Sequence, residues 1–468
     1  MRTRIIYSLV ICFLVLGITS FGLSQTKGKS AKVDRSSYIV NNGDSKIVPY
    51  TSGYTKSNLV LAPAFKSGNF VIGPEINTGV TGWDDYMTNG DCRHYIWLDP
   101  TNPNIINVIY TITDSTDPVG STSRRTVYSF STDGGVTWAP QFNVPNIRSG
   151  FGCLTLTSDG RAAIANHQTQ SGATISSLYV DSYPQLEGFG EYFAPSTNGV
   201  IWPQINMLTN ENGILVGNEN VSSGNDHVRW SIWAQPSGPI GAWNTLWSET
   251  SGTPSNARWG SCTGINGYVA VLIDPVSETN VMGTNAIYSF VSTDNGATFG
   301  AQQTEWQPFQ EGQDTVTAFF GLDLRCKPGT ADRYFVFNTN NGGKYKSARL
   351  WCIKNGGTPH LIADSNKVGN LNTTYFYKTF AGLTGIDHPS IGWSADGSVM
   401  YCVYSVVMND TGVNGWNTRD IFYSYSLDDG VTWSNGIRVT NTPLIDEGYV
   451  GVSLINPGNS PSSYELHM

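Results

Sequence analysis

An eight-residue motif occurs three times in this chain and strongly limits how the chain can fold. The copies are STDGGVTW at 131–138, STDNGATF at 292–299 and SLDDGVTW at 426–433. In each copy, Ser and Asp side chains can bond to turn backbone, Gly can supply a positive φ angle, and Trp or Phe can wedge between strands. The motif therefore predicts a strand-to-strand turn built by Ser131, Asp133, Gly135, Trp138, Ser292, Asp294, Gly296, Phe299, Ser426, Asp428, Gly430 and Trp433.

The motif is part of a longer repeat. Apolar segments that precede the motif, or correspond to such a segment, begin at residues 92, 151, 202, 259, 319, 388 and 449, with spacings between 51 and 69 residues. A unit such as the one starting at 388 contains four short strand patterns, and the motif lies between the third and the fourth. Regular four-stranded units are typical of a β-propeller, because each unit buries its faces only against its neighbours.

The seventh unit has room for only two strands, 449–455 and 463–468. Two further strands are expected near the N-terminus, at 58–65 and 69–77. Pairing the two chain ends in one blade would remove exposed strand edges and close the ring. We therefore predict an all-β propeller of four-stranded antiparallel blades, closed by pairing of N- and C-terminal strands, with seven blades favoured and six as the alternative.

The N-terminus has the features of an export signal. Arg2 and Arg4 precede an apolar run from Ile5 to Ile18, and small and polar residues follow. No other apolar run approaches the roughly 20 residues of a membrane span. We expect a signal peptide at 1–24, a polar leader at 25–56 and the propeller at 57–468, in a protein that is secreted, periplasmic or on the cell surface and has no transmembrane segment in its mature part.

The charge and the cysteine content limit which partners, metals and cross-links are expected. The formal net charge of −9, without a basic stripe, argues against nucleic acid. The six cysteines beyond the signal lie in or beside apolar strands and lack the spacing of a zinc site, so we expect buried core residues, with disulfides as the alternative. We expect a monomer with no metal and no cofactor.

The three motifs are Asp boxes, and residues 57–468 resemble the sialidase-like Asp-box (BNR-repeat) propellers. Sialidases of this type are six-bladed. They clamp a substrate carboxylate with three arginines, use a Tyr nucleophile activated by a Glu, and use an Asp as acid and base. The resemblance implies the following candidates here: Arg93, Asp114, Asp117, Glu447 and Tyr449. Glu219 could replace the Glu, and Arg258, Arg419 and Arg438 could complete the clamp, although no motif points to them.

The starts of the inner strands are expected to surround the mouth of the central channel. Aromatic and polar residues occur there, and sugars bind such surfaces because their C–H faces stack on aromatic rings while their hydroxyls seek polar partners. The alternative is that each aromatic residue packs between blades. The candidate ligand-binding residues are His94, Trp202, Arg258, Trp259, Phe320 and His388.

These observations favour a propeller that recognises a glycan or glycoconjugate without full sialidase chemistry. The alternative is an exo-glycosidase of sialidase type that hydrolyses terminal acidic sugars. A structural or protein-binding propeller is the third possibility.

Overall fold

A computed structural model of the chain describes residues 39–41, 45–47, 78 and 94–468, apart from 115, 118–121, 171, 195–198, 221–225, 236–237, 249–255, 277–285, 342–343, 370–383, 412–416, 444 and 460–463. The chain divides into two units, Met1–Ser37 and Tyr38–Met468, and the second unit contains all the described residues. The predicted signal peptide and the strands expected at 58–65 and 69–77 lie outside the described residues. Within the predicted leader, β1 (Ile39–Asn41) and β2 (Ser45–Ile47) form an antiparallel pair.

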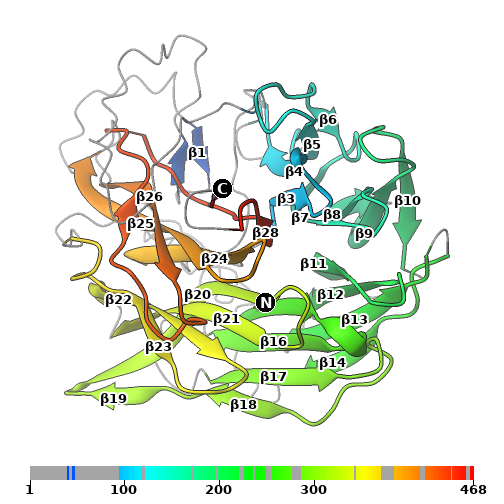
Figure 1. Cartoon of the computed structure of the whole chain (residues 1–468). Coiled ribbons are helices and arrows are strands. Elements are labelled where there is room, and N and C mark those ends of the chain that lie inside the picture. Colours follow the sequence, from blue (N-terminus) through cyan, green and yellow to red (C-terminus); the bar gives the residue numbers. More distant parts are fainter. Residues whose placement is uncertain are drawn as a thin grey trace, which may run out of the picture. The chain divides into compact units, whose positions relative to one another are not determined.

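Six further sheets follow one another along the chain and are arranged around a common axis (Figure 1). The first blade contains β3 (Ile96–Asp99), β4 (Asn102–Ile112), β5 (Arg125–Ser131) and β6 (Phe142–Asn143). The second contains β7 (Ser149–Leu156), β8 (Ala162–Gln170), β9 (Ala173–Asp181) and β10 (Phe189–Phe193). The third contains β11 (Val200–Met207), β12 (Gly213–Asn220), β13 (Asp226–Trp233) and β14 (Asn244–Ser248). The fourth blade contains β15 (Asn256–Thr263), β16 (Val269–Val276), β17 (Ile287–Ser292) and β18 (Gln303–Trp306). The fifth contains β19 (Phe309–Glu311), β20 (Asp314–Cys326), β21 (Arg333–Asn341), β22 (Lys344–Lys354) and β23 (His360–Ala363). The sixth contains β24 (Ile386–Ser394), β25 (Met400–Thr411), β26 (Asn417–Ser426), β27 (Ile437–Arg438) and β28 (Ile455–Asn456).

The blades show a gradient of burial from the axis to the rim. Every residue of the inner strands β7 and β24 is buried, whereas β6 is exposed and β10 is only partly buried. Inner strands covered on both faces read as nearly continuous apolar or small residues, as in SGFGCLTL of β7. Among the described residues, the one short helix is a 3-10 turn at Ile265–Gly267, and no helix there is long and apolar enough to cross a bilayer.

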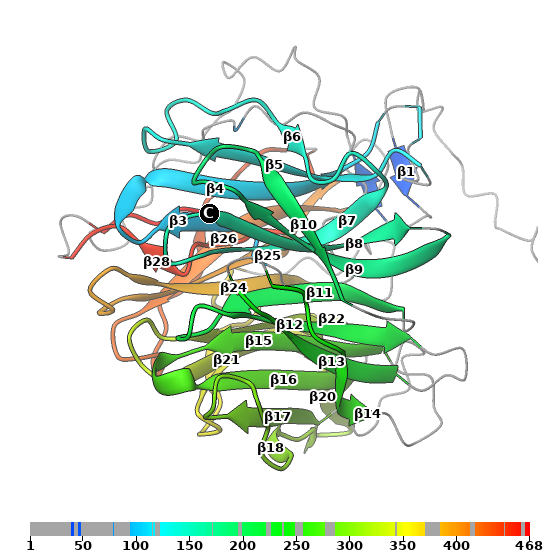
Figure 2. The same ribbon diagram turned by 90° about the vertical axis from the view of Figure 1, so that its right-hand side faces the viewer.

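The hydrophobic core lies in layers between neighbouring blades. One layer joins Cys153 and Leu178 of the second blade to Ile205 and Trp233 of the third. Corresponding layers join blades one and two, three and four, four and five, and five and six. Each blade is therefore stabilised mainly by its two neighbours, as a repeat architecture requires. Figure 2 shows the same sheets from the side.

The ring has six blades, so the prediction of seven was wrong and its six-bladed alternative is correct. The segment that starts at Tyr449 does not begin a seventh blade. It contributes β28, which pairs in parallel with β24 through Trp393↔Ile455 and Ser394↔Asn456. The physical reason is that β24 offers its inner edge to this segment, so Ile455–Asn456 complete the sheet of the sixth blade and do not start a new one.

This C-terminal segment joins the last blade to the first. The Leu98 N–H of β3 donates to Ser453 Oγ (3.0 Å), and the Trp393 N–H of β24 donates to the Leu454 carbonyl (2.9 Å). Val452 is fully buried against Val403 and Tyr423 of the sixth blade. The C-terminal segment therefore lies between blades six and one, but of the two strands predicted there only Ile455–Asn456 forms, and residues 464–468 are not a strand. The N-terminal half of the predicted closure falls outside the described residues.

Candidate ligand-binding mouth of the propeller

Strand direction assigns residues to the two faces of the ring. Successive strands of a blade are antiparallel, so the starts of the first and third strands lie at the same face as the ends of the second. We call this face the mouth. It carries the starts of β7, β11, β15 and β24, the ends of β8 and β16, and the starts of β5 and β26.

Three inner strands share a bulge at the mouth. The pairing register shifts between Gly150 and Cys153 in β7, between Ile201 and Gln204 in β11, and between Asp387 and Ser390 in β24. Phe151, Trp202 and His388, with φ of 55°, 52° and 49°, lie within these bulges, and Tyr449 has a φ of 60°. Left-handed backbone is uncommon for such residues and is often found where a bulge redirects a side chain next to a functional site.

A row of rings runs across blades two, three and four. The Phe151 and His167 rings lie 4.9 Å apart in an edge-to-face arrangement. His167 is 6.3 Å from the Trp202 ring, and Trp202 is 6.4 Å from the Trp259 ring. Phe151, His167 and Trp259 are buried, whereas Trp202 is partly exposed. We refer to Phe151, His167, Trp202 and Trp259 as the ring row.

Hydrogen-bond donors gather at one end of the ring row. Arg124, which precedes β5, lies with its guanidinium carbon 4.6 Å from the centre of the Phe151 ring, and its Nη2 is 3.3 Å from His167 Nε2. On the other side of the imidazole, the Trp202 N–H donates to His167 Nδ1 (3.4 Å). The row therefore presents one partly exposed aromatic face, that of Trp202, backed by a buried cation and a buried imidazole. An exposed aromatic face supported by polar groups is a surface on which a sugar ring can stack.

A second cluster lies in blade six and consists of Asp387, His388, Arg419, Asp446 and Tyr449. The His388 ring is 4.5 Å from the Tyr449 ring, and the Arg419 guanidinium lies 5.3 Å from the centre of the same Tyr449 ring. Asp446 accepts from Arg419 Nε (2.9 Å) and Nη2 (2.7 Å), which fixes the guanidinium. Tyr449 also packs against the core between blades one and two, so the blade-six cluster is next to the first blades across the closure.

The blade-six cluster contains two groups with perturbed ionisation. Burial, reinforced by the charge of Arg419, lowers the pKa of His388 well below its usual value. Burial raises the pKa of Asp387 to about 7, although its oxygens accept from Asn338 Nδ2 (2.8 Å) and from the N–H groups of His388 (2.8 Å) and Thr384 (3.1 Å). Both nitrogens of the His388 ring are buried without a hydrogen-bond partner. The imidazole is therefore neutral near pH 7, and burial together with the Arg419 charge makes it a weak base.

A buried acid–base pair lies at the mouth of blade four. Arg258 of β15 and Asp274 of β16 are register partners, and both side chains are buried. Burial raises the pKa of Asp274 well above its usual value, and the nearby Arg258 charge opposes that shift. Arg258 and Trp259 are both at the mouth, as expected from the sequence, on an inner strand whose pairing with β16 has no bulge.

The other predicted site residues lie elsewhere or are not described. Arg93 and the side chain of Phe320 fall outside the described residues. Asp114 and Asp117 lie in the exposed loop between β4 and β5, where Asp114 Oδ1 accepts from Thr116 and Asp117 Oδ2 accepts from Thr122 and Ser123. Hydrogen bonds from Thr116 lower the pKa of Asp114. Glu447 accepts from Thr442 Oγ1, and its N–H donates to the Arg419 carbonyl (3.0 Å).

His94 is part of a different network, deep in the ring. Its Nε2 lies 3.3 Å from Asp323 Oδ1, and Asp323 Oδ2 accepts from Arg325 Nε (3.1 Å) and from the Ile391 N–H (2.9 Å). Burial and Arg325 oppose a charge on His94, but the bonds to Asp323 and Cys153 outweigh them and raise its pKa. All three charged side chains are almost fully buried, so this network ties together blades one, five and six.

Arg124, His167, Asp274, Asp387 and Asp446 were not recognised as site residues from the sequence. Most of them lie on second or third strands or on connecting segments, and none belongs to a motif. The only signal for His167 and Asp274 is a polar residue at the end of an apolar strand, in IANHQ and LIDP. Such positions are common in strands, and only the strand pairing places His167 beside the bulge of β7 and Asp274 opposite Arg258.

The repeated turns at 131–138, 292–299 and 426–433 lie between the third and fourth strands of blades one, four and six, at the face opposite the mouth. Ser131 Oγ donates to Asp133 Oδ1 (2.8 Å) and accepts from the Gly135 N–H (2.8 Å), while Asp133 accepts from the Thr137 N–H (2.9 Å). The other two turns repeat these bonds. Hydrogen bonds led by the Thr137 side chain lower the pKa of Asp133 to about 2.

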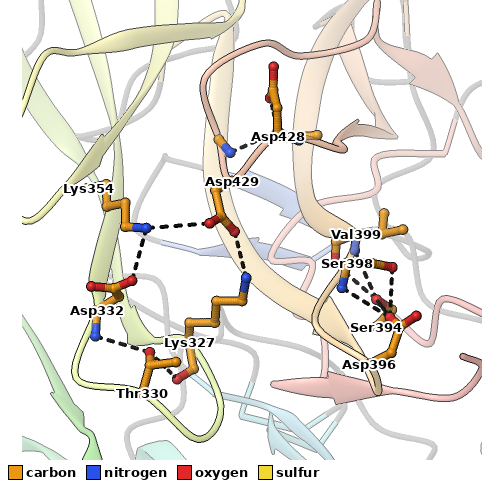
Figure 3. Close-up of polar contacts among 12 residues, drawn as sticks. Lys327, Thr330, Asp332, Lys354, Ser394, Asp396, Ser398, Val399, Asp428 and Asp429 are labelled. Atoms are coloured by element: carbon orange, nitrogen blue, oxygen red, sulfur yellow. Dashed lines mark hydrogen bonds and ion pairs between the residues drawn. The ribbon is translucent and has the colours of Figure 1, made fainter.

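Ion pairs join blades five and six at this opposite face. The Asp429 carboxylate, next to Asp428 of the third repeated turn, lies between Lys327 Nζ (2.6 Å) and Lys354 Nζ (3.4 Å) (Figure 3). Lys354 also pairs with Asp332 (2.9 Å). These groups are partly exposed, so each pair contributes little on its own. Within the described residues, no group of three or more His, Cys, Asp or Glu side chains is arranged to hold a metal ion.

No protein-family model and no curated protein matches the sequence. Among solved structures, the chain is similar to a polysaccharide lyase described as an ulvan lyase of a new family (8% identity, 78% of this chain and 87% of that chain, TM-score 0.48). It is also similar to a protein of unknown function from Dyadobacter fermentans (12% identity, 72% and 94%, TM-score 0.46) and to a thermostable family-43 glycoside hydrolase (14% identity, 76% and 95%, TM-score 0.36). At these identities and TM-scores the similarities assign no function to this chain.

Proposed function

We propose that this propeller binds glycans at its mouth. The observation that carries the proposal is the recurrence of a bulged, left-handed residue with a ring side chain at Phe151, Trp202 and His388, next to Arg124 and Arg419. A propeller that only packs its blades has no need for the same strained backbone at three inner-strand starts. Rings supported by cationic and polar groups suit the alternating apolar faces and hydroxyls of a sugar.

The geometry gives the sialidase-type alternative less support. A clamp for a substrate carboxylate needs guanidinium groups whose hydrogen-bonding edges are free. Arg419 already holds Asp446 through two nitrogens, and Arg438 is paired with Asp420. The lowered pKa of Asp114 keeps that carboxyl ionised near neutral pH, which does not suit a group that must first donate a proton.

Binding is tested with the full chain on a glycan array, followed by calorimetry with the best glycan. We expect Trp202→Ala to weaken binding by roughly tenfold, because stacking on one aromatic face is worth about 1 kcal/mol or more. Tyr183→Ala is the control, since Tyr183 is 70% exposed and lies outside the mouth, in the loop between β9 and β10. Equal binding by the two variants, or no glycan bound by the parent protein, would contradict the proposal and favour the structural or protein-binding alternative.

A second candidate function is glycan cleavage, and the state of His388 favours it. The His388 imidazole is neutral near pH 7 and in contact with Tyr449, so it has an unprotonated ring nitrogen that can face a proton donor, while burial and the Arg419 charge limit its strength as a base. A glycan that binds should then also be shortened, as measured by the release of reducing ends. His388→Asn should abolish this release while leaving binding measurable. A glycan that binds the parent protein but releases no new reducing ends would exclude cleavage.

We also propose that the chain is exported, so that it would bind glycans outside the cytoplasm. The basis is the pattern at residues 1–24. Processing after about residue 24, detected by N-terminal sequencing of the secreted protein, is the expected result.

A further inference from the structure

Two thiols from neighbouring blades face each other in the core between blades four and five. Cys262 lies on β15 and Cys326 on β20, the innermost long strands of these blades. Both are buried in the same hydrophobic cluster, at 3% and 4% exposure. The Cys326 thiol is close enough to Cys262 to contribute, after burial, to the raised pKa of that thiol.

The backbone explains why the thiols meet. The two strands come very close at Gly260, where an added Cβ would lie 2.9 Å from Leu324 Cβ and 3.7 Å from Leu324 Cα. Inner strands of adjacent blades run in the same direction, and in a strand every second side chain points to the same side. Cys262 is two residues after Gly260, and Cys326 is two residues after Leu324. The same close approach therefore places the two thiols opposite each other.

We propose that Cys262 and Cys326 form a disulfide that links blades four and five when the chain folds in the presence of a disulfide-bearing oxidant. One cysteine thiolate attacks the oxidant's disulfide and releases one thiol, and the second thiolate attacks the resulting mixed disulfide and releases the other. The protein loses two protons and two electrons, and the oxidant is reduced to two thiols. Close backbone approach and facing side chains are the geometric requirements of such a bond.

The surroundings decide when the bond forms. Tyr268, which accepts from Arg333 Nη1 (3.0 Å), packs against the cluster that contains both thiols. Burial raises the pKa of Cys262 well above its usual value, more than the Arg333 charge can offset. The thiolate is therefore scarce once the blades have packed, so the bond should form during folding and then resist reduction. This makes it a permanent link between blades and not a redox switch.

The test uses the full chain, reduced in denaturant and refolded with oxidised and reduced glutathione. Free thiols are alkylated under denaturing, non-reducing conditions, and peptides are mapped by mass spectrometry. We expect a peptide pair linked through Cys262 and Cys326, with Cys153, Cys352 and Cys402 alkylated. The oxidised protein should melt higher than the reduced protein by roughly 5 °C or more, since the link closes a long loop in the unfolded chain.

Two variants make the result specific. Cys262→Ser should remove both the linked peptide and the difference in melting temperature between oxidised and reduced protein. Cys352→Ser is the matched control, because Cys352 is equally buried in the next interblade layer, and it should keep both. Alkylation of both Cys262 and Cys326 in native protein refolded with oxidised glutathione would overturn the proposal, and so would a linked peptide that joins other cysteines. Neither outcome bears on glycan binding.

Discussion

At the scale of single residues, the repeated Asp and the terminal aromatic residue of the turn motif have different energetic roles. Asp133 and Asp428 are at the surface, and their oxygens hold the turn backbone and the Thr side chain. Trp433 is 8% exposed and packs in the layer between blades five and six, while its Nε1–H donates to the Gly430 carbonyl (2.9 Å). The Asp therefore shapes the turn, and the Trp anchors it to the core.

We predict that Asp428→Ala lowers the free energy of unfolding by about 1–2 kcal/mol, since it removes a few hydrogen bonds worth about 1 kcal/mol each or less at the surface. Trp433→Ala should lower it by roughly 3–5 kcal/mol, because it empties a buried aromatic site. Chemical denaturation of both variants checks the order. Glycan affinity, measured on folded protein, should not change, and its loss in Asp428→Ala would show that the turns belong to the binding site.

The pH dependence of stability should depend on His388. Its pKa is lowered on folding, so its contribution to stability is present above the unfolded value of about 6.5 and is lost as the pH falls towards the lower folded value. The loss is about 1.4 kcal/mol per pH unit. Asp387 acts in the opposite sense, because its pKa is raised to about 7 and its contribution is lost as the pH rises from about 4 to 7.

His388→Asn separates these two effects, since Asn tolerates the left-handed backbone at this position. The difference in unfolding free energy between parent and variant should become smaller as the pH falls from 7 to 5, as followed by denaturation at each pH. A difference that stays constant over this range would show that the imidazole titrates normally in the folded protein.

At the scale of elements, the bulges of the inner strands depend on side chains of neighbouring blades. The Phe151 N–H, released from the pairing by the bulge in β7, donates to Thr111 Oγ1 of β4 (3.1 Å). Thr126 of β5 is the register partner of Thr111, but its buried hydroxyl has no hydrogen-bond partner. Thr111 therefore supports the bulge through its hydroxyl, whereas the neighbouring Thr126 hydroxyl does not.

Thr111→Val should destabilise the protein by about 1–3 kcal/mol, because it leaves a buried N–H without an acceptor. It should also weaken glycan binding, since the bulge positions the Phe151 ring. Thr126→Val is the matched control and should be neutral or slightly stabilising. Thermal unfolding and calorimetry measure both effects, and equal behaviour of the two variants would show that the hydroxyl does not hold the bulge.

The sequence could predict strands and turns because their signals are local. The spacing of apolar segments indicated the blades, and Gly135 and Asp133 indicated a turn without any knowledge of the ring. The bulges could not be predicted, since Phe151 and Trp202 sit in ordinary apolar runs whose extra residue appears only on pairing with β8 and β12. The contact between His167 and Arg124 could not be predicted either, because the two residues lie in different blades.

At the scale of the whole molecule, the error in blade number has the same origin. The segment after Tyr449 resembles an inner strand in its residues, and the sequence does not show that the sixth blade offers it an inner edge. In the structure β24 has two neighbours, β25 on one side and β28 on the other. The C-terminal segment therefore completes a sheet that was already counted.

A substitution at Gly392 tests this closure. An added Cβ would lie 2.1 Å from the Ser453 carbonyl oxygen and 3.0 Å from Asn456 Nδ2, so Gly392→Ala should push the C-terminal segment away from β24. We expect a loss of about 1–3 kcal/mol, typical of overpacking. At the control position, Gly199, the nearest atom is the Thr174 carbonyl oxygen at 3.6 Å, so Gly199→Ala should be tolerated. Identical denaturation midpoints for the two variants would contradict the closure seen here.

The same closure sets the order of events in folding. Most contacts in a blade join residues close in sequence, so a blade can form soon after its own strands are made. The bond between Leu98 and Ser453 spans 355 residues and cannot form until the last segment is available. The closing face of the first blade must therefore stay uncovered through the synthesis of the blades that follow it. During that interval the nascent chain is most exposed to aggregation, and the docking of 451–456 ends it.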